Sequence, residues 1–426
     1  MKQKNNIKYF SDRSFINSIP HGIVEALRSH GLVAPDMFKI HFCGVISYDD
    51  NIAVFLPRNH AIDEGKEAES GYYLLQALHK YFQTKESGFN DQENGDHFIG
   101  GRAFSLIVNL FNDYQLNGLY ARRVKEHTIN SGKVNWPRTI VRNTPYPSNG
   151  KPIYLDLITS RSRYITNCET AKIHAQVIRE LLNHYGFLWF GKQNIIDEEL
   201  ERLEKPLGEK KQQIKYLERE LRLSYSERDI FLIKGLIQYI KDKKGQASSD
   251  ILIGVRKFHS VWETMLDECL IGKYAVNHKL PIPYYQTHNN EFVPVSKKGQ
   301  RTDTVIQKEN EKRFAVIDAK YYDAKSPQTA PGWPDIVKQL FYQQAVSILE
   351  GEDANISNHF VFPGEMAELK SAHIGKRNKK IGAINDCLSQ YKPIYCHYQP
   401  PMELIRAYVK NSKLERLSSE IFLSVE

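Results

Sequence analysis

An aspartate and a lysine stand two residues apart at the end of an apolar run. The run FAVID, residues 314–318, predicts a strand, and Asp318 and Lys320 then point to the same face because side chains alternate along a strand. Burying such a pair without partners would be costly. The two groups could therefore pair with each other, or together hold a metal ion and a phosphate.

A second aspartate precedes this pair at a distance that suits a hairpin. Asp303 lies on the predicted strand 301–307, and the polar segment QKENEKR can make the turn. The hairpin would bring Asp303 beside Asp318, where two carboxylates repel unless a cation lies between them. Mg²⁺ prefers one or two carboxylates together with water and phosphate oxygens. Metal-activated water, with Lys320 orienting it or stabilising the phosphate, would suit phosphodiester hydrolysis.

Two predicted helices could add further polar groups. Glu263 lies in the predicted helix 254–270, beside Trp262 and before Leu266, where it could supply a third carboxylate or face solvent. In the predicted helix 335–350, Gln339 and Gln343 are four residues apart and share a face.

The C-terminal half has the pattern of a mixed α/β domain, predicted over 251–426. Short strands are predicted at 291–295, 301–307, 314–318, 358–363 and 393–398, and a last helix at 401–410. Strands alternating with helices in this order predict a small mixed sheet flanked by helices.

The preceding residues predict two further regions. An α+β domain over 1–195 would contain two strands within 38–57 that flank a turn at 49–51, helices at 71–83, 103–125 and 168–187, a polar loop at 86–97 and a proline-containing loop from 137 to 152. Residues 196–250 predict a helical connector of two or three helices interrupted near Pro206. A solvated linker is favoured there over an arm that contacts DNA.

Composition limits the class of protein. The 426 residues carry a net charge of +8, which permits a polyanionic partner without requiring one. No apolar run is long enough for a membrane span, and the first residues lack the apolar core of a secretory signal. Five scattered cysteines favour neither a disulfide framework nor a zinc site, and we expect a cytoplasmic protein.

The acidic and basic residues resemble a known enzyme superfamily. RTD, VIDAKYY and the downstream KQLFYQ resemble the PD-(D/E)xK nucleases, in the branch that includes McrC and RecB nucleases. The resemblance implies that Asp303 and Asp318 bind Mg²⁺, with Glu263 and the Ala319 backbone carbonyl as further ligands. It also implies that Lys320 assists hydrolysis and that Gln339 belongs to the site. Thr302 replaces the proline of the superfamily name, and Tyr342 is assigned no role.

Longer blocks resemble LlaJI-type restriction endonucleases. FCGVISYDDNIAVFLPRN, INSGKVNWPRTI and GWPDIVKQLFYQ together span most of the chain. The resemblance implies a nuclease subunit that cuts double-stranded DNA with an AAA+ GTPase partner similar to McrB, because this chain lacks a GxxxxGK[ST] phosphate loop. The N-terminal half would dock that partner. Arg138 and Arg142 could contact phosphates, although an ordinary basic turn is the favoured interpretation.

Two alternatives stay open. The chain could be an autonomous restriction or repair nuclease that reads DNA with its N-terminal half, or a non-catalytic DNA-binding or scaffold protein on a nuclease fold. For a nuclease, cutting both strands needs two copies of the site, so we expect dimers or paired complexes.

Overall fold

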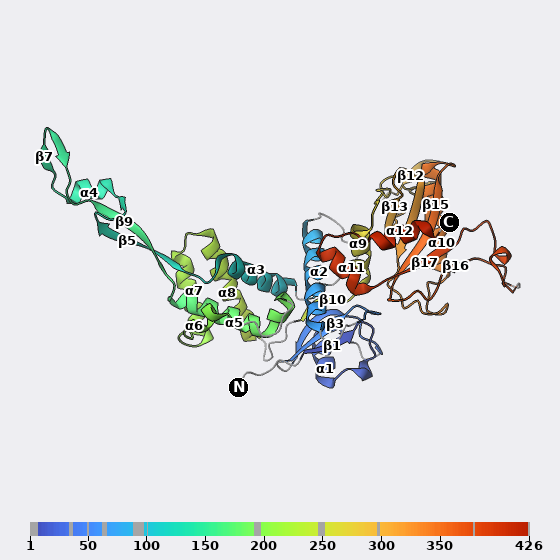
Figure 1. Cartoon of the computed structure of the whole chain (residues 1–426), viewed down its shortest axis with the longest axis horizontal. Coiled ribbons are helices and arrows are strands. Elements are labelled where there is room, and N and C mark those ends of the chain that lie inside the picture. Colours follow the sequence, from blue (N-terminus) through green and yellow to red (C-terminus); the bar gives the residue numbers. More distant parts are fainter. Residues whose placement is uncertain are drawn as a thin grey trace. The chain divides into compact units, whose positions relative to one another are not determined.

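The computed structural model describes residues 7–33, 37–48, 51–61, 66–87, 98–99, 101–190, 197–245, 252–295, 299–377 and 380–424. The fold is mixed α/β, and the chain divides into two compact units (Figure 1). Unit 1 combines residues 1–101 and 250–426 with the short segment 187–193. Unit 2 contains residues 102–186 and 194–249. The units change close to the predicted boundaries at residues 195 and 250, but residues 1–101 belong with 250–426 and not with the rest of the predicted domain 1–195.

The first sheet of unit 1 is built mainly from the N-terminal residues. Its strands, in spatial order, are β1 (Ile7–Ser11), β3 (Asn51–Leu56), β2 (Cys43–Tyr48), β10 (Leu252–Val255) and β4 (Phe98–Ile99). The predicted pair of strands within 38–57 is confirmed as the antiparallel β2 and β3, whereas most of the predicted turn, residues 49–50, lies outside the described residues. Helix α1 (His21–Ser29) buries Ile23 and Leu27 in the core beside this sheet.

Strand β10 explains why the N-terminal residues and the C-terminal half form one unit. The sequence pattern placed a helix over 254–270, but residues 252–255 form a strand between β2 and β4, and helix α9 (His259–Cys269) starts later. All four β10 residues are buried, and so short an apolar run carries no period that separates strand from helix. Gly254 faces Gly44, and a Cβ on Gly254 would lie 2.4 Å from the Cys43 carbonyl oxygen. This close pairing joins the N-terminal sheet to the C-terminal half.

The second sheet of unit 1 carries the predicted site. Its order is β13 (Thr304–Gln307), β14 (Arg313–Ala319), β15 (Asn355–Pro363), β17 (Ile394–Gln399) and β16 (Ser371–Ala372). Strands β14, β15 and β17 are parallel, and the two edge strands are antiparallel to their neighbours. The strands predicted at 301–307, 314–318, 358–363 and 393–398 are thus confirmed. The strand predicted at 291–295 is β12 (Phe292–Pro294), which pairs with β11 (Tyr284–Gln286) outside this sheet.

Helices pack around this second sheet. Helix α10 (Trp333–Glu350) buries Tyr342 and Val346 against Phe314 and Val316 of β14. Helix α11 (Pro401–Val409) packs against α9 and against α2 (Glu67–Ser87), and α12 (Glu415–Leu423) ends the described chain. The predicted helices at 71–83, 335–350 and 401–410 are therefore confirmed. The predicted loop at 86–97 falls almost wholly outside the described residues.

Unit 2 contains the region that the sequence assigned to a connector. Its helices are α3 (Gly101–Asn117), α5 (Glu169–Phe190), α6 (Glu198–Arg202), α7 (Lys210–Leu223) and α8 (Glu227–Gly245). The interruption near Pro206 is confirmed, between α6 and α7. The favoured solvated linker is not, because Leu217 of α7 and Ile233 and Leu236 of α8 are completely buried. Burial of each such side chain stabilises the folded state by about 1.5–3 kcal/mol. These helices therefore form a packed domain.

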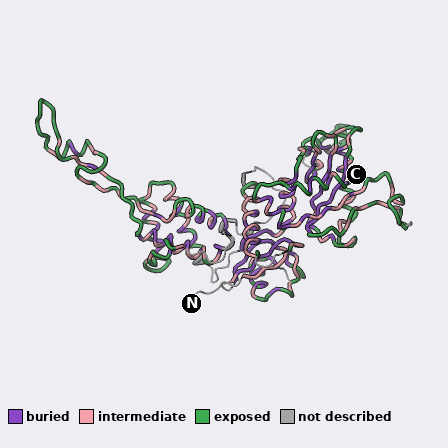
Figure 2. The backbone as a smooth tube through the Cα atoms, in the orientation of Figure 1, coloured by how far each residue is buried: buried purple, intermediate pink, exposed green. Residues whose placement is uncertain are grey.

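Between α3 and α5, the chain of unit 2 forms a long antiparallel ribbon. It comprises β5 (Arg122–Ile129), β6 (Lys133–Val134), α4 (Trp136–Arg142), β7 (Tyr146–Ser148), β8 (Lys151–Ile153) and β9 (Ile158–Ile165). Figure 2 shows that most of it is exposed or half-buried. The predicted helix over 103–125 instead ends at Asn117, and the predicted proline-containing loop holds a helix and a hairpin. Polar residues fill both faces of β5, so hydrophobicity does not reveal its period.

Among the residues that the structure describes, no helix is long and apolar enough to span a membrane.

Candidate active site

The two predicted acidic residues converge at one end of the β13–β14 hairpin. Thr304 pairs with Ile317, which places Asp303, directly before β13, opposite Asp318. The amide N–H of Ala319 donates to Asp303 Oδ2 at 3.0 Å. Asp318 is only 3% exposed. The hairpin register therefore brings together two carboxyl groups that lie fifteen residues apart in the chain.

The two carboxyl groups interact strongly. Burial raises the pKa of Asp303 well above its usual range, the charge of Asp318 and a hydrogen bond with it raise it further, and Glu263 adds a smaller contribution. The Ala319 amide opposes these effects. The site therefore stabilises a shared proton or a bound cation in preference to two bare carboxylates.

Lys320 lies between two carboxylates. Its Nζ is 3.0 Å from Asp318 Oδ2 and 2.8 Å from Asp335 Oδ1, and its side chain is 13% exposed. Burial alone would lower the pKa of Lys320, but the two carboxylates outweigh burial and raise it. The ammonium group is thus protonated at neutral pH. The prediction that Asp318 and Lys320 share a face is confirmed.

Asp335 also lies at this site, although the sequence did not predict it there. It lies in the first turn of α10, after Trp333 and Pro334, where a negative charge is favourable at a helix N-terminus. Its Oδ2 accepts a hydrogen bond from the Tyr322 hydroxyl at 3.2 Å. A proline followed by an acid at a helix start was visible in GWPD, but only the fold shows that this helix begins beside Lys320.

Gln339 reaches the backbone of the sheet. It is completely buried, and its Nε2 donates to the Val316 carbonyl at 2.7 Å and, more weakly, to the His359 carbonyl at 3.5 Å. Gln343, one turn later, donates to the Ile356 carbonyl at 3.1 Å. Both glutamines face the sheet, as their spacing predicts. These contacts anchor α10 to β14 and β15, and with them the start of the helix that carries Asp335.

Glu263 and Ala319 occupy two different positions at the site. Glu263 is partly exposed on α9 between the buried Trp262 and the buried Met265, and its charge reaches Asp303. The Ala319 amide binds Asp303, whereas a role of its carbonyl as a metal ligand stays a prediction.

The donor set fits a magnesium ion held by few protein ligands. In the described part of the chain, no group of three or more histidine, cysteine, aspartate or glutamate residues is close enough to hold a metal. Asp303 and Asp318 instead offer two adjacent carboxyl groups, that of Asp318 buried and that of Asp303 half-buried, and burial together with the charge of Asp318 raises the pKa of Asp303. Mg²⁺ keeps several waters and takes one or two carboxylates, so this pair meets its requirement.

A second lysine, also missed from the sequence, lies near the pair. Lys338 Nζ is 5.3 Å from the centre of the Tyr342 ring. Burial lowers the pKa of Lys338, but Tyr342, Asp318 and Asp303 together raise it. Its charge therefore acts on the acidic pair from α10.

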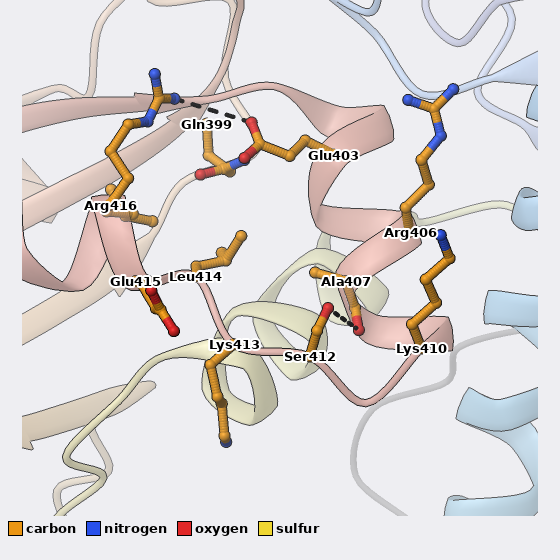
Figure 3. Close-up of a pocket in the computed structure, with 11 residues that line it drawn as sticks. Gln399, Glu403, Arg406, Ala407, Lys410, Ser412, Lys413, Leu414, Glu415 and Arg416 are labelled. Carbon is orange, nitrogen blue, oxygen red and sulfur yellow. Dashed lines mark hydrogen bonds and ion pairs between the residues drawn. The ribbon is translucent and has the colours of Figure 1, made fainter.

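A surface pocket lies apart from these residues. It has a volume of about 460 Å³ and is lined by the end of β17, α11 and the start of α12 (Figure 3). Arg416 is 3.8 Å from Glu403 in an ion pair, and the Ser412 hydroxyl donates to the Ala407 carbonyl. Its lining contains neither the acidic pair nor Lys320.

Comparison with known proteins defines the family. The family profile described as LlaJI restriction endonuclease matches residues 42–375, from β2 to the segment after β16. The chain belongs to the LlaJI restriction endonuclease family. This match spans Asp303, Asp318, Lys320 and Asp335. It also covers residues of both units.

A curated relative is similar along most of its length. The chain is 26% identical over 380 residues to the type II restriction enzyme BsuMI component YdjA of Bacillus subtilis strain 168, covering 83% of this chain and 80% of the relative. Two solved assemblies of Thermococcus gammatolerans also match. McrB AAA+ hexamers with bound McrC give 13% identity and a TM-score of 0.41, with 95% and 98% of the two chains covered. The McrBC complex gives 12% identity and a TM-score of 0.24, with 55% and 80% covered. Both scores are too low to define the fold.

Proposed function

We propose that this protein is the Mg²⁺-dependent nuclease subunit of a restriction system and that it hydrolyses phosphodiester bonds in double-stranded DNA. The β13–β17 sheet with α9 and α10 would be a PD-(D/E)xK core. One observation carries the proposal: Asp303 and Asp318 converge, and Lys320 lies 3.0 Å from Asp318. Membership of the LlaJI family supports it.

Each residue has a role that follows from its position. Asp303 and Asp318 would hold the ion, with Glu263 at its periphery. When bound, magnesium would supply a water of lowered pKa and neutralise charge on the phosphate. Lys320, protonated and fixed between two carboxylates, would stabilise negative charge that develops on the phosphate. Asp335 would keep Lys320 extended toward Asp318, and Gln339 would hold α10 in place.

A cleavage assay tests the proposal. Purified protein is incubated with plasmid and Mg²⁺, with and without an AAA+ GTPase partner and GTP. The Asp318→Ala variant is expected to lose all cleavage, because it removes one of two carboxylates. The control Asp353→Ala removes an exposed aspartate from the turn after α10 and is expected to cut normally. Normal cleavage by Asp318→Ala would overturn the site assignment.

The ribbon of unit 2 favours a nuclease whose cleavage of DNA depends on a partner protein. Several of its large apolar side chains are exposed: Ile129, Trp136, Ile140, Val141, Tyr146, Ile153, Leu155, Tyr164 and Ile165. Apolar side chains gathered on an extended element mark a protein-interaction surface. We propose that this ribbon docks the AAA+ GTPase, in agreement with the docking role expected for the N-terminal half.

Substitution on the ribbon tests the docking role. Trp136→Ser combined with Ile140→Ser is expected to abolish co-purification with the GTPase while leaving the thermal unfolding temperature unchanged. Phe231→Ser, on the exposed side of α8 in the same unit, serves as the control. Retention of the partner by the ribbon variant would contradict the docking proposal.

The same cleavage assay separates the alternatives. Cutting without partner or nucleotide would identify an autonomous nuclease. DNA binding without cutting under any condition would identify a non-catalytic protein. The convergence of all three active-site residues favours catalysis over the latter.

A further inference from the structure

One loop of the N-terminal sheet contacts the ends of both strands that position the site. The loop follows β3. Arg58 Nη2 is 3.7 Å from Asp323 Oδ2, Asn59 Nδ2 donates to the Pro363 carbonyl at 3.0 Å, and the Ala61 amide donates to Glu365 at 3.1 Å. Asp323 follows β14, whereas Pro363 and Glu365 lie at the end of β15. Because β14 and β15 are parallel, these contacts fall at the edge where Lys320 emerges.

Tyr321 is the centre of this contact. It follows Lys320 directly, is 5% exposed, and points its hydroxyl into the N-terminal sheet. The backbone amide of Arg58 donates to that hydroxyl at 2.8 Å, and Arg58 Nη1 donates to the Tyr321 carbonyl at 3.4 Å. The hydroxyl also hydrogen-bonds the buried carboxylate of Asp12, at the end of β1. One side chain is thus bound to the residues that follow two strands of the first sheet, β1 and β3.

The ring of Tyr321 also contacts the helix that carries Glu263. Its centre lies 5.4 Å from that of Phe258 and 6.0 Å from that of Trp262, and Trp262 Nε1 donates to the Val361 carbonyl at 3.4 Å. The ring contacts fix the plane of the Tyr321 ring. The hydrogen bonds of its hydroxyl fix how far the side chain extends toward the first sheet. Little freedom is left at this position.

We propose that Tyr321 and Arg58 form a latch that positions Lys320 for catalysis; this inference rests on the nuclease function proposed above. Few other contacts hold the backbone at Lys320. Lys320 lies beyond the last residue of β14, and its backbone is fixed by one ladder bond, from its amide to the Val361 carbonyl, and by a tight turn from the Tyr322 amide to its own carbonyl. With Tyr321 fixed on one side of the chain, Lys320 projects to the other, toward Asp318 and Asp335.

Lysine reactivity tests the latch without any need for DNA cleavage. The protein is treated briefly with acetic anhydride, and acetylation of Lys320 is measured by mass spectrometry relative to the exposed Lys370. Tyr321→Phe is expected to raise the rate at Lys320 by about 2- to 10-fold, the population change that loss of one hydrogen bond permits. Tyr274→Phe, which removes a hydroxyl that donates to Glu350 at 2.7 Å, is expected to leave the rate unchanged.

Cleavage kinetics give the second measurement. Tyr321→Phe is expected to lower kcat about 10-fold, because a less well positioned Lys320 stabilises charge on the phosphate less in the transition state. The KM for DNA and the Mg²⁺ concentration for half-maximal activity are expected to stay within about twofold, because the acidic pair is untouched. A purely structural tyrosine would lower the active fraction and the unfolding temperature without making Lys320 more reactive.

A double-variant cycle completes the test. Arg58→Ala is expected to reproduce both effects, Arg58→Lys to reproduce them in part, and the double variant to be no worse than the stronger single one, because both side chains act through one contact. If the effects of the two single substitutions multiply in the double variant, or if the acetylation rate of Lys320 is unchanged in Tyr321→Phe, the latch proposal is wrong. If the wild-type protein cuts no DNA under any condition, the nuclease proposal fails, and the acetylation result still decides whether the latch exists.

Discussion

Replacing Asp303 with asparagine is expected to stabilise the metal-free protein while abolishing cleavage. Asparagine keeps an oxygen that can accept the Ala319 amide bond, now 3.0 Å long, and it nearly preserves volume. It removes a carboxyl group that must either carry a second negative charge beside Asp318 or hold a proton. The same change removes one of the two carboxylates proposed to hold Mg²⁺.

The size of the effect follows from the carboxyl pair. A charged neighbour in contact shifts a carboxyl pKa by about 1–3 units, and each unit corresponds to about 1.4 kcal/mol. Part of this gain is offset because the asparagine amide is itself buried and needs hydrogen-bond partners. We therefore expect Asp303→Asn to raise the free energy of unfolding by about 1–3 kcal/mol near pH 8.

The sign of the pH dependence is also fixed. The pKa of Asp303 is higher in the folded protein than in the unfolded chain, so folding takes up a proton between these two values. Wild-type stability should then fall as pH rises through this window, while the variant lacks this loss. The stability advantage of Asp303→Asn is therefore expected to be small at about pH 4, near the unfolded-state pKa of an aspartate, and to grow toward pH 8.

Thermal unfolding at several pH values, with and without Mg²⁺, measures both effects. Mg²⁺ is expected to raise the unfolding temperature of the wild type and to leave that of Asp303→Asn nearly unchanged, because only the wild type retains both carboxylates. Asp353→Asn, an exposed aspartate, is the matched control. A variant that is no more stable than the wild type at pH 8, or that gains as much from Mg²⁺, would refute the paired-carboxylate reasoning.

Two further predictions follow from the same site. Lys320→Ala is expected to abolish cutting and preserve the fold, because Asp335 is partly exposed and can be hydrated; a circular dichroism spectrum that shows collapse would identify a structural ion pair instead. Glu263→Gln is expected to raise the Mg²⁺ concentration needed for half-maximal cleavage several-fold, about the effect of losing a group that supports a metal site, and unchanged Mg²⁺ dependence would place Glu263 outside the site.

Much of the second sheet could be predicted from local patterns. FAVID and NHFVFP are apolar runs of strand length, and the helix 335–350 shows clear periodicity, so the elements were predicted nearly in place. The convergence of Asp303 with Asp318 followed from hairpin spacing alone. Contacts close in sequence are constrained by short turns, which is why the sequence suffices for them.

Other elements were missed because their signals are not local. Strand β10 is only four residues long, and it is a strand because β2 and β4 lie on either side of it. The residues of β5 alternate between half-buried and exposed positions without alternating in polarity, so the ribbon was missed. The helices of 196–250 were predicted, but their burial depends on packing against other helices of the same unit.

The sequence by itself determined the residues of the proposed site: two aspartates and a lysine, spaced so that a hairpin and one strand bring them together. Only the tertiary structure decided what holds them. Asp335 reaches Lys320 from the start of a helix, and Tyr321 meets Arg58 across 263 positions of chain. Local spacing fixes which groups can meet within a hairpin. Partners so far apart meet only when whole sheets pack, and that depends on the sum of many buried contacts.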